Sequence, residues 1–372
     1  MKFAFIVNNY PPRVGGVELH VHALATELLT LGHEVTVITL SEAPSATYEL
    51  GAEVIRLQER LRVGDVLGFP PLGTKRKISR ILHSRDIDVV SIHTRFFPMS
   101  YLGLRSARNA SIPVVHTEHG SDHVASDSLL IRICSRIVDL TIGRIVLQRA
   151  NQVLGVSEAV VEFVKRLAGV KASVFYNAIT ETQSNPFVSQ DCTKYVFVGR
   201  IVPGKGWDTF LQMIANLHRE DTSITAHIIG DGPDIEAAAL LIEELNLSGV
   251  AILHGRQSQQ QVREHLRGAT LVNPTTLAEG FQTTLIEAVA EGGRVLTFPV
   301  PGSTKLRETG APVYITSDRT LESLELVAKE INRQTWVPAS RAILAPWFWP
   351  RRAQEFVAIC LAAVENASAR KR

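Results

Sequence analysis

Two series of short apolar runs, separated by helix-length segments, most constrain what this chain can fold into. Each run is a strand-length stretch rich in Val, Ile and Leu. The first series comprises residues 2–7, 34–39, 88–93, 113–119, 152–157 and 173–177. The second comprises residues 194–200, 225–232, 250–255, 269–275, 293–300 and 312–316. Such runs are typical of parallel strands covered by helices on both faces. The pattern predicts an α/β protein with two doubly wound sheets.

The stretch between the two series predicts a domain boundary. Residues 178–193 are polar, contain a proline and show no periodicity, so they read as a linker. A length of 372 residues also exceeds one ordinary core and favours two domains. In contrast, the apolar residues of 17–28 recur with a helical period, which predicts an amphipathic helix packed on the first sheet.

Composition excludes several classes of protein. Hydrophobic residues make up 45% and charged residues 20%, as in a globular protein. The formal net charge of +2 gives no nucleic-acid signature. The three cysteines lie far apart, which predicts neither a disulfide framework nor a structural zinc site and fits a reducing cytoplasm. The apolar run 3–7 is too short for a signal peptide, and charged residues interrupt the segment 129–149, so no transmembrane segment is expected.

The first half of the chain has a slight excess of positive charge, because residues 1–180 hold 20 Lys and Arg against 16 Asp and Glu, and the remainder hold 19 against 21. The run KRKISR at 75–80 and the arginines between 132 and 149 are candidates for contact with an anionic surface, such as the inner face of a membrane. The alternative is an ordinary solvated helix face.

Two glycines follow the first strand of the first series, and two cations follow the first strand of the second series. Gly15 and Gly16 precede the first predicted helix, where backbone N–H groups can approach an anion or a sugar, or where the glycines only make the turn. Arg200 and Lys205 follow the strand at 194–200 in a Gly-Pro loop. Together they are suited to neutralising a diphosphate without metal, although solvated loop cations would look the same.

A histidine-rich segment spans the end of the fourth run of the first series and the residues after it. It contains His116, His119 and His123 with Glu118 and Asp122. A metal site, a structural turn and an active-site role for His119 all remain open, and the absence of HExxH spacing disfavours metal. The DxD spacing of residues 86–88 precedes a strand, at the wrong edge of the sheet for a ligand site, and predicts a structural role.

Two carboxylates bracket a predicted helix start in LAEGFQTTLIEAVAE. Glu279 precedes a helix expected to begin near Phe281, and Glu287 is expected about two turns along it. A glycosidase acid pair would not require the nearby cations. A diphosphate bound at the helix N-terminus explains both the cations and the carboxylates better. Glu279 would then accept hydrogen bonds from a sugar, and Glu287 from a ribose.

The ordered motifs resemble those of the retaining family 4 glycosyltransferases (GT4). They are PPRVGGVELHVHALATELLTLGHEVTVIT, HTEHG, FVGRIVPGKG, HIIGDGP, ILHGR and EGFQTTLIEA, and they span nearly the whole chain. The resemblance implies a GT-B fold, in which two doubly wound Rossmann-like domains face a central crevice. It further implies an acceptor-binding domain at 1–180 completed by a C-terminal helix at 350–372, and a donor-binding domain at 181–349.

The resemblance also implies roles for individual residues. His119, Arg200, Lys205 and Glu279 are the implied catalytic residues. The implied donor-binding residues are Gly16, Arg200, Lys205, Gly255, Arg256, Glu279, Gly280, Phe281, Gln282, Thr283, Thr284 and Glu287. The implied acceptor-binding residues are Gly15, Gly16, His93, His119 and Asp122. No metal or other cofactor is expected. Gln282, Thr283 and Thr284 depart from the EGFG pattern of many relatives, as do Ala178 and Lys305 from their usual counterparts, which leaves the donor open.

The predicted function is metal-independent hexosyl transfer with retention, in the cytoplasm or at the inner face of the membrane. The donor is a nucleotide-sugar, of the UDP or GDP type, and the acceptor is a hydroxyl of a glycan, a lipid-linked or a small molecule. The alternatives are a nucleotide-sugar epimerase or hydrolase of the same architecture, or a non-enzymatic nucleotide-sugar binding protein. The sequence does not indicate an oligomeric state.

Overall fold

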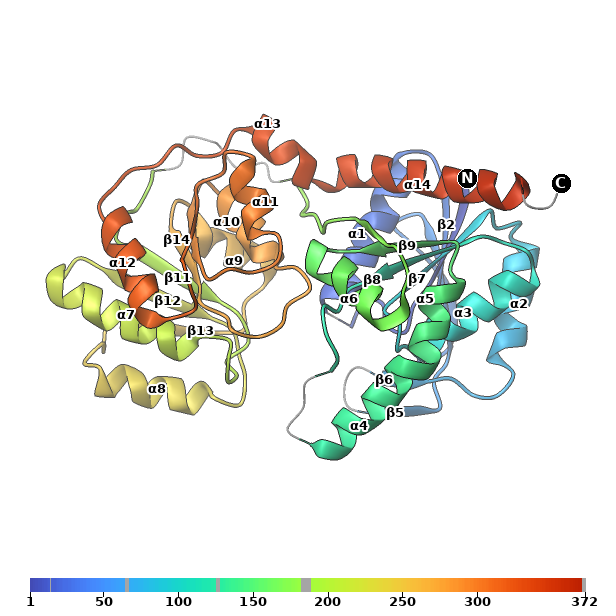
Figure 1. Cartoon of the computed structure of the whole chain (residues 1–372), viewed down its shortest axis with the longest axis horizontal. Coiled ribbons are helices and arrows are strands. Elements are labelled where there is room, and N and C mark those ends of the chain that lie inside the picture. Colours follow the sequence, from blue (N-terminus) through green and yellow to red (C-terminus); the bar gives the residue numbers. More distant parts are fainter. Residues whose placement is uncertain (14, 64–66, 125–127, 182–188, 370–372) are drawn as a thin grey trace. The chain divides into compact units, whose positions relative to one another are not determined.

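A computed structural model describes residues 1–369 except 14, 64–66, 125–127 and 182–188. The chain forms two compact units (Figure 1). The first contains Met1–Thr180 together with Phe348–Arg372, and the second contains Glu181–Trp347. The centre of the predicted linker and residues 370–372 of the predicted C-terminal helix lie outside the described residues.

The first unit is built on a sheet with the strand order β10-β9-β8-β7-β1-β2-β4-β3. Its strands are β1 (Lys2–Ile6), β2 (Glu34–Ser41), β3 (Ser45–Glu49), β4 (Ala52–Gln58), β7 (Val89–His93), β8 (Val114–Glu118), β9 (Gln152–Gly155) and β10 (Ser173–Val174). All neighbours pair in parallel except β3, which runs antiparallel to β4 at the edge. A separate antiparallel ribbon joins β5 (Leu61–Val63) and β6 (Leu67–Phe69).

Helices cover both faces of this sheet, because alternate residues of each strand point to opposite sides. Phe3 and Phe5 of β1 belong to a core with α1 and α14, whereas Ala4 and Ile6 belong to a second core with α2, α3 and α5. The helical elements are α1 (Gly16–Thr30), α2 (Thr74–Ser84), α3 (Pro98–Asn109), α4 (Leu129–Val138), the π-helical turn η1 (Asp139–Gly143), α5 (Arg144–Arg149), α6 (Glu158–Ala168) and α14 (Trp349–Ala369).

The last described helix returns to the first unit. A parallel bridge pairs Ile179 with Phe348, and the Trp349 N–H donates to the Ile179 carbonyl at 3.2 Å. Helix α14 then packs along α1 (Figure 1). Its Phe356 is fully buried and lies against Phe3, Phe5 and Phe175. The first core is therefore completed by residues distant in sequence.

The second unit contains a parallel sheet with the order β13-β12-β11-β14-β15-β16. Its strands are β11 (Lys194–Val198), β12 (Thr225–Ile229), β13 (Ala251–Gly255), β14 (Thr270–Asn273), β15 (Arg294–Thr297) and β16 (Val313–Ile315). Helices α7, α8 and α12 share one core with the sheet. The helical elements are α7 (Trp207–Glu220), α8 (Ile235–Glu244), α9 (Gln259–Leu266), α10 (Thr283–Ala290), α11 (Ser303–Glu308), α12 (Leu321–Ile331), α13 (Arg341–Leu344) and the 3₁₀ turn η2 (Ala345–Trp347).

The structure confirms the two doubly wound sheets predicted from the apolar runs. Each predicted run contains a strand, and the structure has four further strands, β3, β4, β5 and β6, among the described residues. Among the described residues, no helix is both long and apolar enough to cross a membrane.

The contribution of α14 to the first core can be measured directly. We expect Phe356→Ala to lower the free energy of unfolding of the first unit by about 3–5 kcal/mol, because a large cavity is left among three phenylalanines. The matched control is Leu361→Ala on the same helix, where the side chain is 44% exposed. Denaturant unfolding monitored by circular dichroism gives both values. Equal effects of the two variants would show that α14 does not complete the core.

Candidate active site

The predicted site residues follow the carboxyl ends of parallel strands, where the strand order reverses. In the first sheet β1 lies between β2 and β7, and in the second sheet β11 lies between β12 and β14. Chain connections leave such a pair of strands in opposite directions, which opens a ligand-binding position at their carboxyl ends. Each unit therefore offers one such position.

In the second unit, the loop after β11 is fastened to the loop after β14. The Gly204 carbonyl accepts a hydrogen bond from the Thr276 N–H at 2.9 Å and one from the Thr275 hydroxyl at 3.2 Å. Gly206 has a φ of 87°, and a Cβ there would lie 2.3 Å from the Pro274 carbonyl oxygen. Only glycine allows this approach. The two loops thus meet at the point of strand-order reversal.

The fastened loops bring Lys205 and Glu279 together. The Lys205 ammonium lies 2.7 Å from the Glu279 carboxylate, and the two side chains are 14% and 23% exposed. Such a partly exposed pair can open at lower cost than a fully buried one, because water solvates each charge when they separate. Arg200 is exposed on the same loop. An incoming anion can therefore replace Glu279 as the partner of the Lys205 ammonium.

Helix α10 begins later than predicted. It starts at Thr283, with Gln282 in an extended conformation before it, rather than near Phe281. The Phe281 ring stacks on Trp347 with centroids 5.9 Å apart and lies against Gly302, which holds the chain out of the helix at this point. Glu287 consequently lies just over one turn into α10, not two.

The start of α10 combines backbone donors with buried side-chain groups. Glu287 is 6% exposed, and its carboxylate accepts a hydrogen bond from the Gln259 amide at 3.0 Å. Burial raises the pKa of Glu287, although the bond from Gln259 opposes this. The Gln282 amide nitrogen is buried and has no hydrogen-bond partner among the described residues. Thr283 and Thr284 occupy the first turn, where backbone N–H groups are free for a ligand.

The remaining predicted donor residues of this unit lie at the end of β13 and before α10. Gly255 ends β13 with a φ of 65°, and its carbonyl accepts a hydrogen bond from the Gly230 N–H at 2.9 Å. Arg256 follows it and is exposed. Gly280 lies between Glu279 and Phe281 in the segment that precedes the helix.

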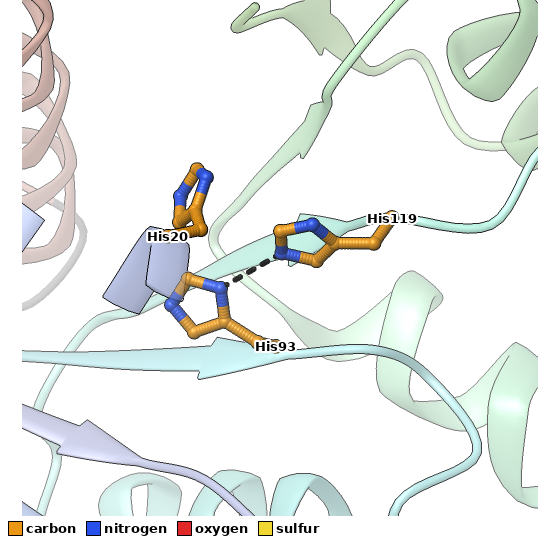
Figure 2. A group of neighbouring side chains, drawn as sticks. All are labelled: His20, His93 and His119. Carbon is orange, nitrogen blue, oxygen red and sulfur yellow. Dashed lines mark hydrogen bonds between the residues drawn. The ribbon is translucent and has the colours of Figure 1, made fainter. Parts of the chain in front are cut away.

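In the first unit, three histidines converge at the carboxyl ends of β7 and β8 (Figure 2). His93 ends β7, His119 directly follows β8, and His20 comes from α1. The His93 Nδ1 lies 3.1 Å from the His119 Nε2, and the other His93 nitrogen lies 3.1 Å from the Ser91 hydroxyl. The His20 ring is perpendicular to the His119 ring at 4.8 Å. His93 is fully buried, so it contacts His119 rather than solvent.

Burial favours the neutral form of all three imidazoles. Burial lowers the pKa of His20 to about 4, although a hydrogen bond with Asn177 opposes the shift. Burial and the charges of the neighbouring histidines lower the pKa values of His93 and His119 well below the usual histidine value. The cluster can therefore exchange hydrogen bonds with a polar ligand without adding positive charge.

A buried ionic network fixes the turn that carries His119. The Glu118 carboxylate accepts hydrogen bonds from the Arg95 guanidinium at 3.0 Å and from the backbone N–H groups of His119 at 3.1 Å and Gly120 at 3.0 Å. Arg95 also binds Asp139 at 2.8 Å. Burial by itself raises the pKa of Glu118, but the Arg95 charge and these donors outweigh it and hold the pKa well below its usual range.

The other predicted residues of the first unit occupy exposed turns or pair elsewhere. Gly15 and Gly16 begin α1 as expected, and the Glu18 carboxylate folds back towards Gly15. Asp122 is exposed, and its carboxylate accepts the His123 N–H at 2.8 Å. His116 binds Glu118, and His123 binds Asp139. His116 and His123 thus pair with carboxylates, whereas His119 contacts His93 and His20.

The DxD segment has the structural role predicted for it. The Asp88 carboxylate accepts the Lys2 backbone N–H at 2.8 Å, at the amino end of the sheet.

Sequence reasoning missed His20, Asn177, Arg95 and Gln259. His20 lies on the buried, apolar face of α1, where a histidine in the sequence could have indicated a functional residue. Its Nδ1 lies 2.8 Å from the Asn177 side-chain oxygen. Arg95 follows the strand end at His93, but its partners are more than twenty residues away in sequence. No sequence pattern predicts the contact between Gln259 and Glu287.

The fold and sites define an α/β protein with two Rossmann-like ligand-binding units. Two family models match adjacent parts of the chain: Glycosyltransferase Family 4 at residues 14–183 and Glycosyl transferases group 1 at residues 180–327. The chain belongs to these family 4 glycosyltransferases and has the GT-B fold, and it is an enzyme of the glycosyltransferase type.

Named relatives and solved structures agree with this assignment. The phosphatidylinositol N-acetylglucosaminyltransferase GPI3 subunit of Saccharomyces cerevisiae is 25% identical over 352 residues, covering 89% of this chain and 75% of the relative. The alpha-monoglucosyldiacylglycerol synthase of Streptococcus pneumoniae is 23% identical, covering 81% and 72%. The structure of Anabaena HepE in complex with UDP and glucose has a TM-score of 0.71 at 16% identity, covering 97% of this chain and 99% of HepE.

Removing the charge of Glu118 should destabilise the first unit. We expect Glu118→Gln to lower its free energy of unfolding by about 3–5 kcal/mol at pH 7, because the Arg95 charge loses a buried partner. The carboxylate is stabilising only when ionised, so the difference from wild type should shrink as the pH falls below the ordinary carboxyl range. Urea unfolding at several pH values measures both effects. The control is Glu308→Gln, which removes an exposed pair with Lys305 and should cost less than about 1 kcal/mol.

Proposed function

We propose that this enzyme transfers a sugar from a nucleotide-sugar to an acceptor hydroxyl, with retention of configuration and without a metal ion. The observation that carries the proposal is the Lys205–Glu279 pair, which lies where the strand order of the second sheet reverses. A bound diphosphate offers the Lys205 ammonium a stronger anionic partner than one carboxylate. Glu279 is then released to accept hydrogen bonds from the hydroxyls of the donor sugar.

The same cations would stabilise the leaving group. As the bond between the anomeric carbon and the phosphate oxygen breaks, negative charge accumulates on the diphosphate. Lys205, Arg200 and the backbone N–H groups at the start of α10 supply positive potential for that charge. These groups take the place that a divalent metal has in other transferases. On the nucleotide side, Glu287 is held by Gln259 and is suited to accepting a ribose hydroxyl.

The neutral state of His119 suits a reaction in which positive charge develops on the sugar. A protonated imidazole would repel the anomeric carbon as the leaving group departs, whereas a neutral one can hydrogen-bond the sugar without that penalty. Burial keeps His119 neutral, and Glu118 fixes its backbone. The acceptor oxygen then attacks from the face that the diphosphate leaves, and its proton passes to a phosphate oxygen. This order of events retains the anomeric configuration without a covalent enzyme intermediate.

We further propose that the donor carries UDP or GDP and that the acceptor is presented at a membrane. The structure of HepE contains UDP and glucose, and the two named relatives act on phosphatidylinositol and diacylglycerol lipids by their names. Helix α4 provides the corresponding surface. It has no buried residue, and its Leu129, Leu130, Ile131, Ile133 and Ile137 are 50–70% exposed.

Charge supports a membrane as the partner of this α4 surface. Arg132 and Arg136 lie exposed on the same helix. Apolar side chains that enter the acyl boundary, combined with arginines at the level of anionic headgroups, are typical of helices that lie in a membrane interface. In Figure 1, α4 continues through η1 into α5 and projects from the sheet of the first unit.

Replacing Lys205 should abolish most of the turnover. We expect Lys205→Ala to lower kcat by about 100- to 1,000-fold, since it removes a charge aimed at the leaving diphosphate. Donors would be chosen by thermal shift with UDP-, GDP- and ADP-sugars, and turnover measured as sugar transferred to acceptor. Lys329→Ala, which alters an exposed lysine on α12, is the control. Unchanged turnover in Lys205→Ala would contradict the mechanism, and sugar conversion without an acceptor product would indicate an epimerase or hydrolase.

The α4 surface should determine binding to anionic vesicles. We expect Leu130→Glu to reduce cosedimentation with phosphatidylglycerol vesicles by about tenfold or more, because it introduces a negative charge into the apolar face. Leu326→Glu is a matched control, since Leu130 and Leu326 are both 70% exposed and Leu326 lies on α12 of the second unit. Equal binding by the two variants would overturn the membrane assignment. Phosphatidylcholine vesicles test the contribution of the arginines.

A further inference from the structure

A second histidine cluster lies in the second unit, and none of its three residues is assigned to the reaction. It consists of His227 on β12, His254 on β13 and His265 on α9. The ring centroids are 5.1 Å apart for the first pair, 5.3 Å for His227 and His265, and 4.3 Å for His254 and His265. The His227 Nδ1 lies 2.9 Å from the His254 Nε2.

The topology of the sheet explains why these side chains meet. Ala226 and Ile228 point into the core shared with α7 and α8, so the intervening His227 points to the opposite face. His254 reaches the same face from the edge strand, and α9 places His265 over it. All three side chains are half-buried, which leaves the cluster accessible to small solutes.

We infer that His227, His254 and His265 form a binding site for a divalent late transition-metal ion, of which Zn²⁺ is the natural example. One ring nitrogen from each histidine lies within 4.8 Å of the other two. Three nitrogens around a tetrahedral Zn²⁺ at bond lengths of about 2.0–2.1 Å lie about 3.4 Å from one another. Small rotations of the half-buried side chains bridge this difference, and a water molecule completes the coordination.

Burial and nearby charges act on all three imidazoles of the cluster. Burial and the nearby Lys194 charge lower the pKa of His227 to about 4, and the same causes lower the pKa of His254. The pKa of His265 is lowered by burial and by its neighbouring histidine.

One neighbour opposes the metal ion and two carboxylates favour it. The Lys194 ammonium adds positive charge, although burial lowers its own pKa. Asp191 and Glu264 act on the cluster with the opposite sign. We therefore expect a site of moderate affinity that selects metals preferring imidazole over oxygen ligands, rather than Mg²⁺ or Ca²⁺.

A bound ion would connect three elements beside the predicted nucleotide contacts. It would tie β12, the edge strand β13 and α9 to one another. Gly255 and Arg256 directly follow His254, and Gln259, the partner of Glu287, begins α9. The metal site does not depend on the transferase mechanism, because none of its three ligands has a role in that reaction.

Titration with Co²⁺ tests the site on tag-free, full-length protein. Co²⁺ in a tetrahedral site absorbs visible light, so binding is read directly, and Zn²⁺ should displace it. We expect His265→Gln to weaken Co²⁺ binding by at least about tenfold, a loss that even an outer-shell partner of a metal ligand can cause. His254→Gln should have the same effect and serves as an independent variant if the first does not fold, which circular dichroism will show.

The other histidine cluster supplies the control. His20→Gln alters the group formed by His20, His93 and His119 and should leave the Co²⁺ spectrum and affinity unchanged. The inference is overturned if wild-type protein gives no tetrahedral Co²⁺ spectrum, if His265→Gln and His254→Gln bind as wild type does, or if only His20→Gln loses binding.

Discussion

Parallel strand pairing is the constraint on which the two sites depend. When neighbouring strands run in the same direction, their carboxyl ends and the loops that follow lie along one edge. The order of each sheet reverses at one pair of strands, β1 with β7 and β11 with β14. Polar residues far apart in sequence are thereby brought to one place, as Lys205 and Glu279 are across 74 residues. The strand order of each sheet thus determines where a ligand site can form, whichever side chains the loops carry.

The ion pairs of the two units differ in burial. In the first, Arg95, Glu118 and Asp139 are fully buried, and Arg95 pairs with both carboxylates, while Glu118 also accepts the His119 backbone N–H and so holds that turn in place. In the second, Lys205 and Glu279 are partly exposed and share one contact that a ligand can replace. A buried pair is costly to break, whereas a partly solvated pair is not. In the proposed mechanism, the buried network suits His119, which stays neutral and oriented, and the partly exposed pair suits Lys205 and Glu279, which change partners when the donor binds.

Sequence patterns predicted the parts of the fold that repeat and missed the parts that do not. Every strand with a neighbour on both sides is predicted except β4, because a continuous apolar run of this length is typical of a strand buried on both faces, whereas charged residues interrupt the β4 sequence AEVIRLQ. The edge strand β3 was missed because its sequence SATYE is almost wholly exposed and carries no apolar signal. The loops with Lys205 and Glu279 were recognised by residue type and position after a strand. Arg95 and Gln259 could not be, because their partners are set by tertiary contacts that local spacing does not encode.

Helix α14 has a consequence for the order in which this protein can be made. During synthesis, residues 1–180 leave the ribosome first, yet Phe3, Phe5 and Phe175 pack against Phe356. The whole second unit is translated before that partner exists. Nascent domains usually fold in chain order, but here the second unit can reach its final core while the first still exposes an apolar groove. The first unit is thus translated before the second but can complete its core only after the second has been made.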